Sequence, residues 1–324
     1  GIDVSKSVID VCIYTLGILN QFENSKSGFK KMLLWIFKNT NYNKKEFLFV
    51  FEHTGMYSDN LGVFLDSQNY HFCIVPGLEI KKSMGITRGK DDQVDAKRIA
   101  LYAYRLRDEL IPSKLPSKDI STLKSLNSLR LKLVKQRAGY KSTLKEQKAV
   151  YSKKDFKTIF EVQQKMIVIL TKEIQKLETK MQQIIKVNET LSTNYNLTIS
   201  VKGIGPQTAF TILIYTDNFT KFKTWRKFAS YCGIAPFPYQ SGSSIKGRTK
   251  VSHLANKKLK SILNMCAVSS IQHNPEMKLF YQRRIESGKN KMSTINIIRN
   301  KLISRVFATV KRQTPYVDIM KFAA

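Results

Sequence analysis

GIDVSKSVIDVCIY, residues 1–14, decides the fold of the first part of the chain. β-Branched residues dominate this run, which predicts a β-strand, and Asp3 stands between Ile2 and Val4. Burying a carboxylate among such residues costs free energy unless it is hydrogen-bonded, paired with a cation or bound to a metal. Asp3 is therefore the first candidate functional residue.

Further strands and helices follow the opening run. Residues 16–24 predict a hairpin partner, and EFLFVFEHTG (46–55) predicts a strand that ends in Glu52. The patterns also predict helices over 27–39, over 58–68 and from about 93, and a strand over 71–77. A hairpin followed by alternating strands and helices predicts an α/β domain with a mixed sheet over residues 1–115.

The rest of the chain is helical by pattern. In residues 116–195, apolar residues recur every seven positions from Phe160 to Met181, a second series runs from Leu170 to Leu191, and a comparable stripe runs upstream from Leu126 to Leu144. We expect two coiled-coil helices that pair antiparallel within the chain and also between chains. Residues 196–324 predict helices joined by glycine-containing turns. The expected fold class is therefore α/β plus all-α, with a mainly α C-terminal domain.

The composition excludes several classes of protein. The chain has 324 residues, 42% of them apolar, enough for two or three domains. No run approaches ~20 apolar residues, so we expect no membrane span, and no secretory signal is recognisable. Four cysteines without CxxC spacing predict free thiols in a reducing cytoplasm. Because the chain starts at Gly1 without a methionine, we expect that a few residues are missing or were removed.

The charge points to a polyanionic partner. The net charge is +31 and the pI about 9.9. Residues 201–324 hold 4 acids against 22 Lys and Arg, and the segment between Asp217 and Glu276 has ten bases and no acid. A solvated surface normally mixes signs, and no basic amphipathic helix with an aromatic face stands out. We therefore predict binding to nucleic acid rather than to a membrane surface.

Four carboxylates have positions that suit a metal site. Glu52 follows five apolar residues, and Asp92 and Asp95 stand three apart at the start of a helix, where they share a face. With Asp3 they offer the hard oxygen ligands that two Mg²⁺ ions need beside a phosphodiester, with Mn²⁺ as a possible substitute.

Each of these acids also fits a purely structural role. A strand-end acid is often only at the surface, and Asp92 would serve equally well as an N-cap. Asp10 and Asp91 are the competing ligands. In a single continuous strand, the side chain of Asp10 would lie on the side opposite that of Asp3. Asp91 directly precedes Asp92, so it would not share the helix face of Asp92 and Asp95.

VKGIGPQTAFTIL (201–213) has the pattern of a helix-hairpin-helix contact with a DNA backbone. Gly203 and Gly205 precede a helix-forming run, so their backbone N–H groups are candidate phosphate ligands. The alternative is a tight turn between two packed helices, which favours glycine for steric reasons alone.

GIAPFPYQSGSSIKGRTKVSHLANKKLK (233–260) places serines 241, 243 and 244 before a dense run of bases. We expect Lys246, Arg248 and Lys250 to bind a nucleic-acid backbone. The segment is either a flexible polar loop or the site of a serine that acts as the nucleophile on phosphorus. A serine hydroxyl needs a base, a metal or nearby cations. No histidine or acid lies close to these serines in the sequence, and His253 is the nearest. The help must therefore come from elsewhere in the fold or from another subunit.

The ordered set GIDVSK, FEHTG, KDDQVDAKRIA, VKGIGPQTA and GIAPFPYQSGSSIKG resembles the DEDD transposases of bacterial insertion sequences, the IS110 group, over essentially the whole chain. The resemblance implies a RuvC-like domain of RNase H fold (1–115), a coiled coil (116–195) and a C-terminal transposase domain with a helix-hairpin-helix (196–324). It implies metal-binding acids at Asp3, Glu52, Asp92 and Asp95, and the nucleophile at Ser241, with Ser243 and Ser244 as fallbacks. Asp91 replaces the threonine of the family pattern.

The resemblance also implies a function. Members act as recombinases guided by a structured non-coding RNA that pairs with target and donor DNA. The serine becomes joined to DNA, assisted by Mg²⁺ on the acids of a partner subunit, so we expect a homo-oligomer, dimer or tetramer, in the bacterial cytoplasm and associated with the nucleoid. The rivals are a metal-dependent Holliday-junction resolvase or nuclease that uses water, and a non-enzymatic nucleic-acid-binding protein.

Overall fold

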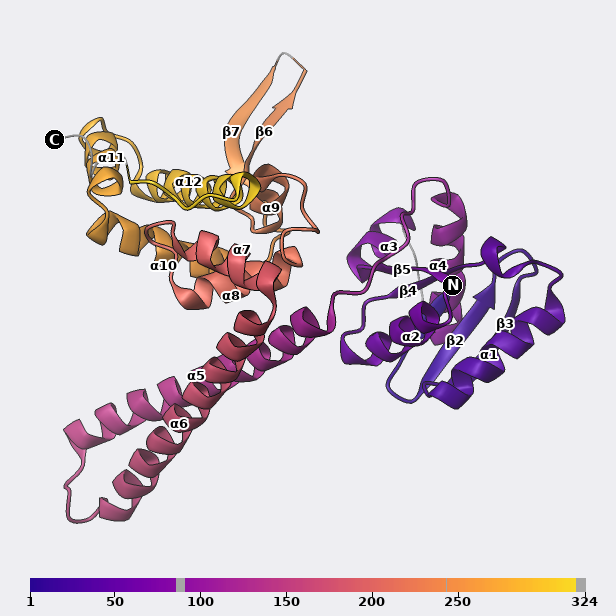
Figure 1. Ribbon diagram of the computed structural model, residues 1–324, viewed down its shortest axis with the longest axis horizontal. Coiled ribbons are helices and arrows are strands. Elements are labelled where there is room, and N and C mark those ends of the chain that lie inside the picture. Colours follow the sequence, from indigo (N-terminus) through magenta and orange to yellow (C-terminus); the bar gives the residue numbers. More distant parts are fainter. Residues whose placement is uncertain (86–90, 243, 319–324) are drawn as a thin grey trace. The chain divides into compact units, whose positions relative to one another are not determined.

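The computed structural model describes residues 1–85, 91–242 and 244–318. The fold is mixed α/β, and the chain divides into two compact units, Gly1–Leu115 and Pro116–Ala324. Figure 1 shows a sheet with helices in the first unit and a long helix pair with a helical body in the second. None of the described helices has the length and apolarity needed to cross a membrane. All four cysteines are buried and free.

A five-stranded sheet forms the centre of the first unit. Its order is β3-β2-β1-β4-β5, with β1 antiparallel to β2, β2 antiparallel to β3, and β1, β4 and β5 parallel. A 3₁₀ turn, η1, precedes β4. The strands are β1 (Ile2–Val4), β2 (Val8–Ile13), β3 (Ile18–Glu23), β4 (Leu48–Glu52) and β5 (His71–Val75).

The opening run is a hairpin, and the prediction of one continuous strand was wrong. β1 ends at Val4, and the chain turns at Ser5, whose backbone N–H and hydroxyl both donate to the Val8 carbonyl, at 3.0 and 2.8 Å. Serine favours such turns because its hydroxyl bonds to nearby backbone. The turn pairs Asp3 with Asp10 across β1 and β2.

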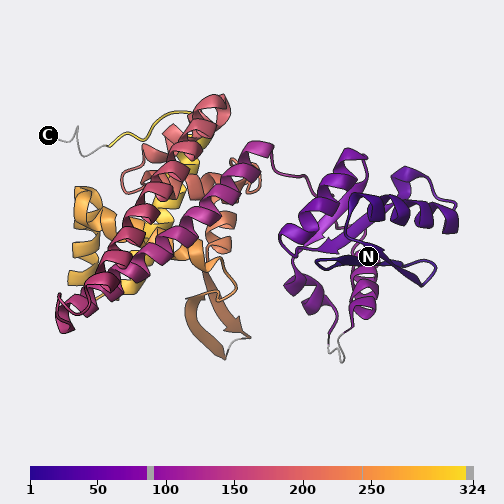
Figure 2. The ribbon, with the colours of Figure 1, turned by 90° about the horizontal axis from the view of Figure 1, so that it is seen from below.

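Helices cover both faces of this sheet (Figure 2). α1 (Lys26–Asn39) and α2 (Met56–Ser67) pack on the face that carries Ile2, Ile9 and Phe51. α3 (Gly77–Ser83) and α4 (Asp92–Arg105) pack on the opposite face. Because strand side chains alternate between faces, the neighbours of the first set, including Asp3 and Asp10, lie on the α4 face.

Two long antiparallel helices begin the second unit: α5 (Lys118–Val150) and α6 (Lys157–Val187). α6 buries Phe160, Ile167 and Ile174 of the predicted heptad series, but α5 leaves Leu129 47% exposed. α6 ends before Asn188, whose side chain accepts from the Leu191 N–H and caps α7 (Glu189–Ile199). The heptad series therefore does not continue through Leu191 as one helix.

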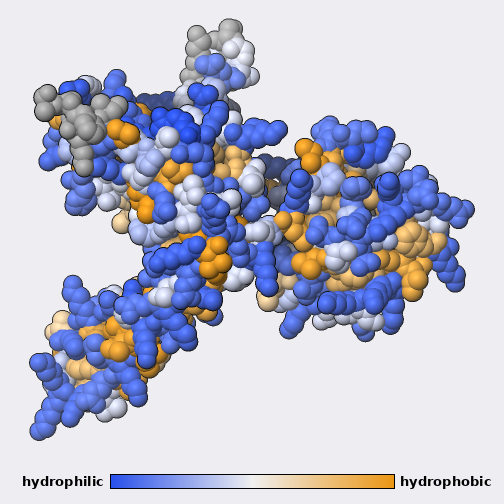
Figure 3. Space-filling view, in the orientation of Figure 1, coloured by the Kyte–Doolittle hydropathy of each residue, from blue (hydrophilic) through white to orange (hydrophobic). Residues whose placement is uncertain are grey.

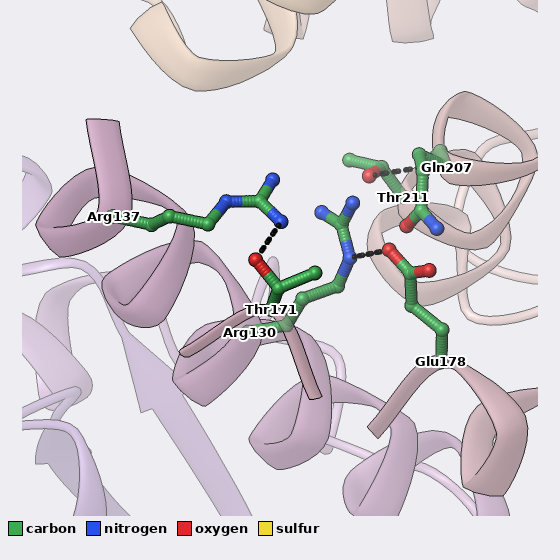
Figure 4. A network of polar contacts seen from close by, with 6 residues as sticks. All are labelled: Arg130, Arg137, Thr171, Glu178, Gln207 and Thr211. Atoms are coloured by element: carbon green, nitrogen blue, oxygen red, sulfur yellow. Dashed lines mark hydrogen bonds and ion pairs between the residues drawn. The ribbon is translucent and has the colours of Figure 1, made fainter. Parts of the chain in front are cut away.

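Polar contacts join the helix pair (Figure 4). Arg130 of α5 donates to Glu178 of α6 at 2.6 Å, and Arg137 donates to Thr171 at 3.3 Å. Where α5 begins and α6 ends, the pair packs on α8 (Pro206–Thr216). The buried residues of this contact are Ile120, Leu123, Met181, Ile185, Leu191, Phe210, Leu213 and Ile214. Figure 3 shows apolar patches among the charged residues of the pair, and Val162, Val168 and Ile169 of α6 are exposed.

The helical body continues with α9 (Trp225–Tyr231), α10 (Lys257–His273), α11 (Pro275–Glu286) and α12 (Lys291–Arg312) around one apolar core. Between α9 and α10, β6 (Pro236–Ser241) and β7 (Ile245–Val251) form a two-stranded hairpin that projects from the helices in both ribbon views. The sequence pattern predicted only helices and turns here, because every residue of β6 is exposed and no apolar alternation marks the strand.

Candidate active site

Carboxylates form a row across three neighbouring strands on the α4 face of the sheet. Asp3 pairs with Asp10 on β2. On the other side Ile2 pairs with Phe51, so the next residue along each parallel strand places Asp3 beside Glu52. The three side chains therefore share one face, at the end where β1 and β4 both finish.

α4 adds further acids to this row because it packs on β1, β2 and β4. The Asp91 side chain accepts from the Gln93 N–H at 3.1 Å and caps the helix. The N-cap is thus Asp91, and the alternative N-cap role for Asp92 is wrong. Asp92 is the exposed first residue of α4, and Asp95, one turn on, pairs with Arg98 at 2.8 Å.

Three of the predicted acids act electrostatically on the fourth, Asp3. Burial raises the pKa of Asp3 to about 6, and the charges of Asp92, Asp95 and Glu52 contribute to this rise, against a lowering by the Val4 backbone. Acids raise each other's pKa only when they lie close together. All four residues that the sequence singled out are therefore near neighbours in the fold.

Asp10 belongs to the same cluster, contrary to the expectation that it lies on the opposite side. Residues 3 and 10 would face opposite ways in one strand, but the turn at Ser5 restores them to one face. Asp10 is 2% exposed and accepts from the Gln21 amide at 3.0 and 3.3 Å. Burial raises the pKa of Asp10, as do Asp92 and Asp91, while Gln21 lowers it.

A glycine makes room for the Glu52 side chain. A Cβ atom added to Gly77, the first residue of α3, would lie 2.0 Å from Glu52 Oε1. Only glycine allows this approach, so the start of α3 sets the position of the Glu52 carboxylate. No local sequence pattern marks this contact, because Glu52 ends β4 and Gly77 begins α3, 25 residues later in the chain.

The chemistry of this donor set fits a divalent cation. Arg98 pairs with one of these acids, Asp95, but the charges of Asp92, Asp95 and Glu52 still act together to raise the pKa of Asp3. Carboxylate oxygens are the ligands that Mg²⁺ takes. Within residues 1–85, 91–242 and 244–318, however, no three His, Cys, Asp or Glu side chains are already placed around one ion position.

Ser241 is the exposed last residue of β6. Among the described residues none hydrogen-bonds its hydroxyl. Ser244 is also exposed, whereas Ser243 lies outside the described residues.

The base of the hairpin is anchored although its tip is exposed. Asn296 and Asn300 of α12 both donate to the Ile234 carbonyl, at 2.8 and 2.9 Å, just before β6. On the β7 side, Asn256 donates to the Tyr231 hydroxyl, and Gly233 lies so close to Ala255 that an added Cβ would be 2.3 Å away. The helices thus anchor the base of the hairpin that carries Ser241.

Gly203, in the loop before α8, lies against α10. Gly203 has φ +96°, and an added Cβ would meet the Ser270 hydroxyl at 1.8 Å. A hydrogen bond from the Gly205 backbone lowers the pKa of the Cys266 thiol, although burial raises it more. Gly203 therefore has a packing role, whereas a Cβ added to Gly205 would meet nothing within 4 Å. Phosphate binding by the N–H groups of both glycines stays a prediction.

The predicted backbone-binding bases follow Ser241 on β7. Arg248 and Lys250 are exposed, and Lys250 pairs with Phe237. The side chain of Lys246 lies outside the described residues. With its exposed cations and exposed serine, the hairpin is suited to a polyanion.

Comparisons with known proteins identify the family of the chain. The family model DEDD_Tnp_IS110, described as transposase, matches residues 1–147, and a second model, transposase IS116/IS110/IS902 family, matches residues 195–282. The chain belongs to the IS110 family of transposases. Members of this family are enzymes that act on DNA, and their DEDD domain implies dependence on a divalent metal in general.

Two curated relatives of this IS110-family transposase match almost its whole length, and a third matches part of it. The pilin gene-inverting proteins of Moraxella lacunata and Moraxella bovis are 29% and 28% identical, each over 98% of this chain and 96% of the relative. An uncharacterized protein of the insertion element IS110 from Streptomyces coelicolor is 30% identical over 37% of this chain and 30% of its own length.

Proposed function

We propose that this transposase is an RNA-guided recombinase that cuts and rejoins DNA through Ser241, with Mg²⁺ held by Asp3, Glu52, Asp92 and Asp95. The observation that carries the proposal is the meeting of these acids from two strands and one helix, where the pKa of Asp3 rises to about 6. The strand order β3-β2-β1-β4-β5, with a leading antiparallel hairpin, supports a RuvC-like domain of RNase H fold.

The proposed reaction exchanges one ester for another. The Ser241 oxygen forms a bond to phosphorus while a bridging P–O bond of the DNA strand breaks. The serine proton passes to a base, and the departing deoxyribose oxygen takes up a proton. Attack by a new deoxyribose hydroxyl on the phosphoserine ester reverses these events and rejoins the DNA. A bound Mg²⁺ would stabilise the charge that develops on the phosphate oxygens.

We infer that Ser241 and the carboxylates of different subunits work together. The Ser241 hydroxyl has no hydrogen-bond partner among the described residues, and a serine without a base or metal is a weak nucleophile. The exposed apolar residues of α6 support pairing of the long helices between chains as a dimer or tetramer. Action in the bacterial cytoplasm, near the nucleoid, follows from a DNA substrate.

RNA guidance is the remaining part of the proposal. Its support is the net charge of +31, most of it outside the carboxylate domain, which suits simultaneous binding of RNA and DNA. The test is copurification: the wild-type protein should retain a discrete RNA species encoded beside its gene. Strand exchange at full rate after complete ribonuclease treatment would contradict guidance.

DNA inversion is a second candidate outcome of the same chemistry. Two relatives named for inverting a pilin gene cover 98% of this chain. A plasmid with two element ends in inverted orientation distinguishes inversion from excision by restriction mapping. Either product supports recombination, whereas neither product with the native RNA present contradicts it.

Substitution of the acids tests the enzymatic part. Asp3→Ala should abolish strand exchange and leave nucleic-acid binding largely intact. Full activity in that variant would contradict the proposed site. DNA cut by the wild type without rejoining or adduct would favour the water-using nuclease, and binding without any cutting would favour the non-enzymatic protein.

A further inference from the structure

Two exposed aromatic rings lie on the hairpin that carries Ser241. Phe237 is 47% exposed and Tyr239 is 67% exposed. Both line a hollow of about 680 Å³ beside the hairpin, together with Gly247, Arg248, Lys250 and Leu254. We call this surface the aromatic hollow. An isolated two-stranded hairpin is of marginal stability in water, so a bound partner would order it further.

Strand geometry relates the aromatic hollow to the serine. Tyr239 and Ser241 stand two residues apart in the regularly paired part of β6 and so share a face. Tyr239 pairs with Gly247 and Ser241 pairs with Ile245, while the register irregularity lies between Phe237 and Tyr239. Two residues of a strand span about 7 Å, so Tyr239 is one strand period from the proposed nucleophile.

A glycine opposite the tyrosine frees space for its ring. A Cβ atom added to Gly247 would lie 2.8 Å from Tyr239 Cδ1, so the ring lies across the glycine and no side chain competes for this position. The charged residues that line the hollow are the cations Arg248 and Lys250. An aromatic ring flanked by cations suits a nucleotide, because its base stacks and its phosphate is neutralised.

We propose that the aromatic hollow holds an unpaired DNA base next to the phosphodiester that Ser241 attacks. The inference rests on the proposed function, because Ser241 places the hollow beside the reacting strand. Paired bases within a duplex are already stacked on both sides, so a ring can stack only on a base that has left the duplex. Tyr239 supplies the main stacking surface, and Arg248 and Lys250 hold the neighbouring phosphates.

Fluorescence of 2-aminopurine, which falls when the base stacks, tests this placement with the full-length protein. The probes are single-stranded DNA oligonucleotides of one element end, each with one 2-aminopurine at a position flanking the cleavage site. Tyr239→Leu keeps an apolar side chain without a π face, and Tyr239→Trp keeps stacking. Tyr151→Leu, at an exposed tyrosine that follows α5, is the matched control.

We expect quenching at a position next to the cleavage site in the wild type, in Tyr239→Trp and in Tyr151→Leu. Tyr239→Leu should lose the quenching and bind single-stranded DNA about 5- to 100-fold more weakly, as expected for the loss of one stacked base, with its circular dichroism unchanged. Equal quenching in Tyr239→Leu, or quenching only with single-stranded RNA of the same sequence, overturns the proposal.

This measurement needs no catalysis, so it is separable from the proposed function. Repeated in a Ser241→Ala background, it should give the same quenching. A covalent adduct in the wild type without base quenching would overturn base binding by the aromatic hollow and leave the proposed function standing. Quenching without an adduct would leave the hollow as a DNA-binding site and overturn the serine mechanism.

Discussion

Asp3 and Asp10 are register partners across β1 and β2, so both carboxylates point to the face of the sheet that α4 covers. Glu52 continues this row on β4, and the Gln21 amide closes it on β3 by donating to Asp10. A row of like charges, with Asp10 buried and Asp3 and Glu52 half-buried, destabilises a protein unless protons or cations neutralise it. This relationship leads to the first two predictions.

Without metal, the fold should lose stability as pH rises through the titration of Asp3. Its pKa is about 6 in the folded protein against 3.8 unfolded, so the folded state binds the proton more tightly. Protonation therefore stabilises the fold, and this contribution disappears between about pH 4 and pH 6. Asp3→Asn should stabilise the metal-free protein at pH 7.5 by about 1 to 2 kcal/mol after allowance for solvent screening.

Urea unfolding at pH 4.5 and 7.5, with EDTA, measures the effect of Asp3→Asn. Asp59→Asn, at an exposed acid on α2, serves as control and should change little at either pH. If Asp3→Asn destabilised the protein at pH 7.5 more than at pH 4.5, the sign of the predicted charge repulsion would be wrong.

Asp10 should support metal binding without replacing any of the four predicted ligands. Asp10→Asn keeps the shape of the side chain but removes a buried charge beside Asp3. Residues that orient ligands typically change metal affinity about 10- to 100-fold, so half-maximal Mn²⁺ binding in calorimetry should require that much more metal. An unchanged affinity would show that Asp10 has only a structural role beside Gln21.

Gly77→Ala should disable the site while preserving the fold. The added Cβ would lie 2.0 Å from the Glu52 carboxylate, which must rotate away. We expect at least a tenfold loss of strand exchange, with the melting temperature within a few degrees of wild type. Gly139→Ala, where nothing lies within 4 Å of the new atom and the residue is inside α5, should keep activity and gain about 0.5–1 kcal/mol of stability. Wild-type activity in Gly77→Ala would contradict a defined position for Glu52.

Mixing two inactive variants should restore activity if the site is shared between subunits. Ser241→Ala supplies intact carboxylates, and Asp92→Ala supplies an intact serine, so a mixed oligomer holds one complete composite site. We expect strand exchange in the mixture at a sizeable fraction of the wild-type rate and none from either variant alone. Failure of every mixing ratio, with mixed oligomers confirmed by mass, would place both groups in one chain.

The sequence predicted elements whose patterns are local. The apolar runs before Glu52 and in residues 71–77 are strands, and the spacing of Asp92 and Asp95 places both on α4 as expected. The acids meet because strand ends and a helix start adjoin in this topology, which the resemblance to DEDD transposases implied.

Features that depend on strand pairing or on tertiary contacts could not be predicted from local sequence patterns. The face of Asp10 depends on one turn at Ser5, since a single extra or missing residue in the turn would move Asp10 to the other side. Every residue of β6 is exposed, so no buried face requires apolar alternation in this strand, and the sequence pattern predicted only helices and turns here. The close approach of Gly77 to Glu52 is a tertiary contact without any local pattern.

The most direct test of the central claim is covalent trapping followed by peptide mass spectrometry. The wild type is incubated with element-end DNA, the native RNA and Mg²⁺, and the digested adduct is sequenced. We predict a nucleotide on Ser241, absent from Ser241→Ala and from Asp92→Ala. An adduct on Ser244 would move the nucleophile by three residues, whereas cleaved DNA with no adduct on any residue would contradict the serine mechanism.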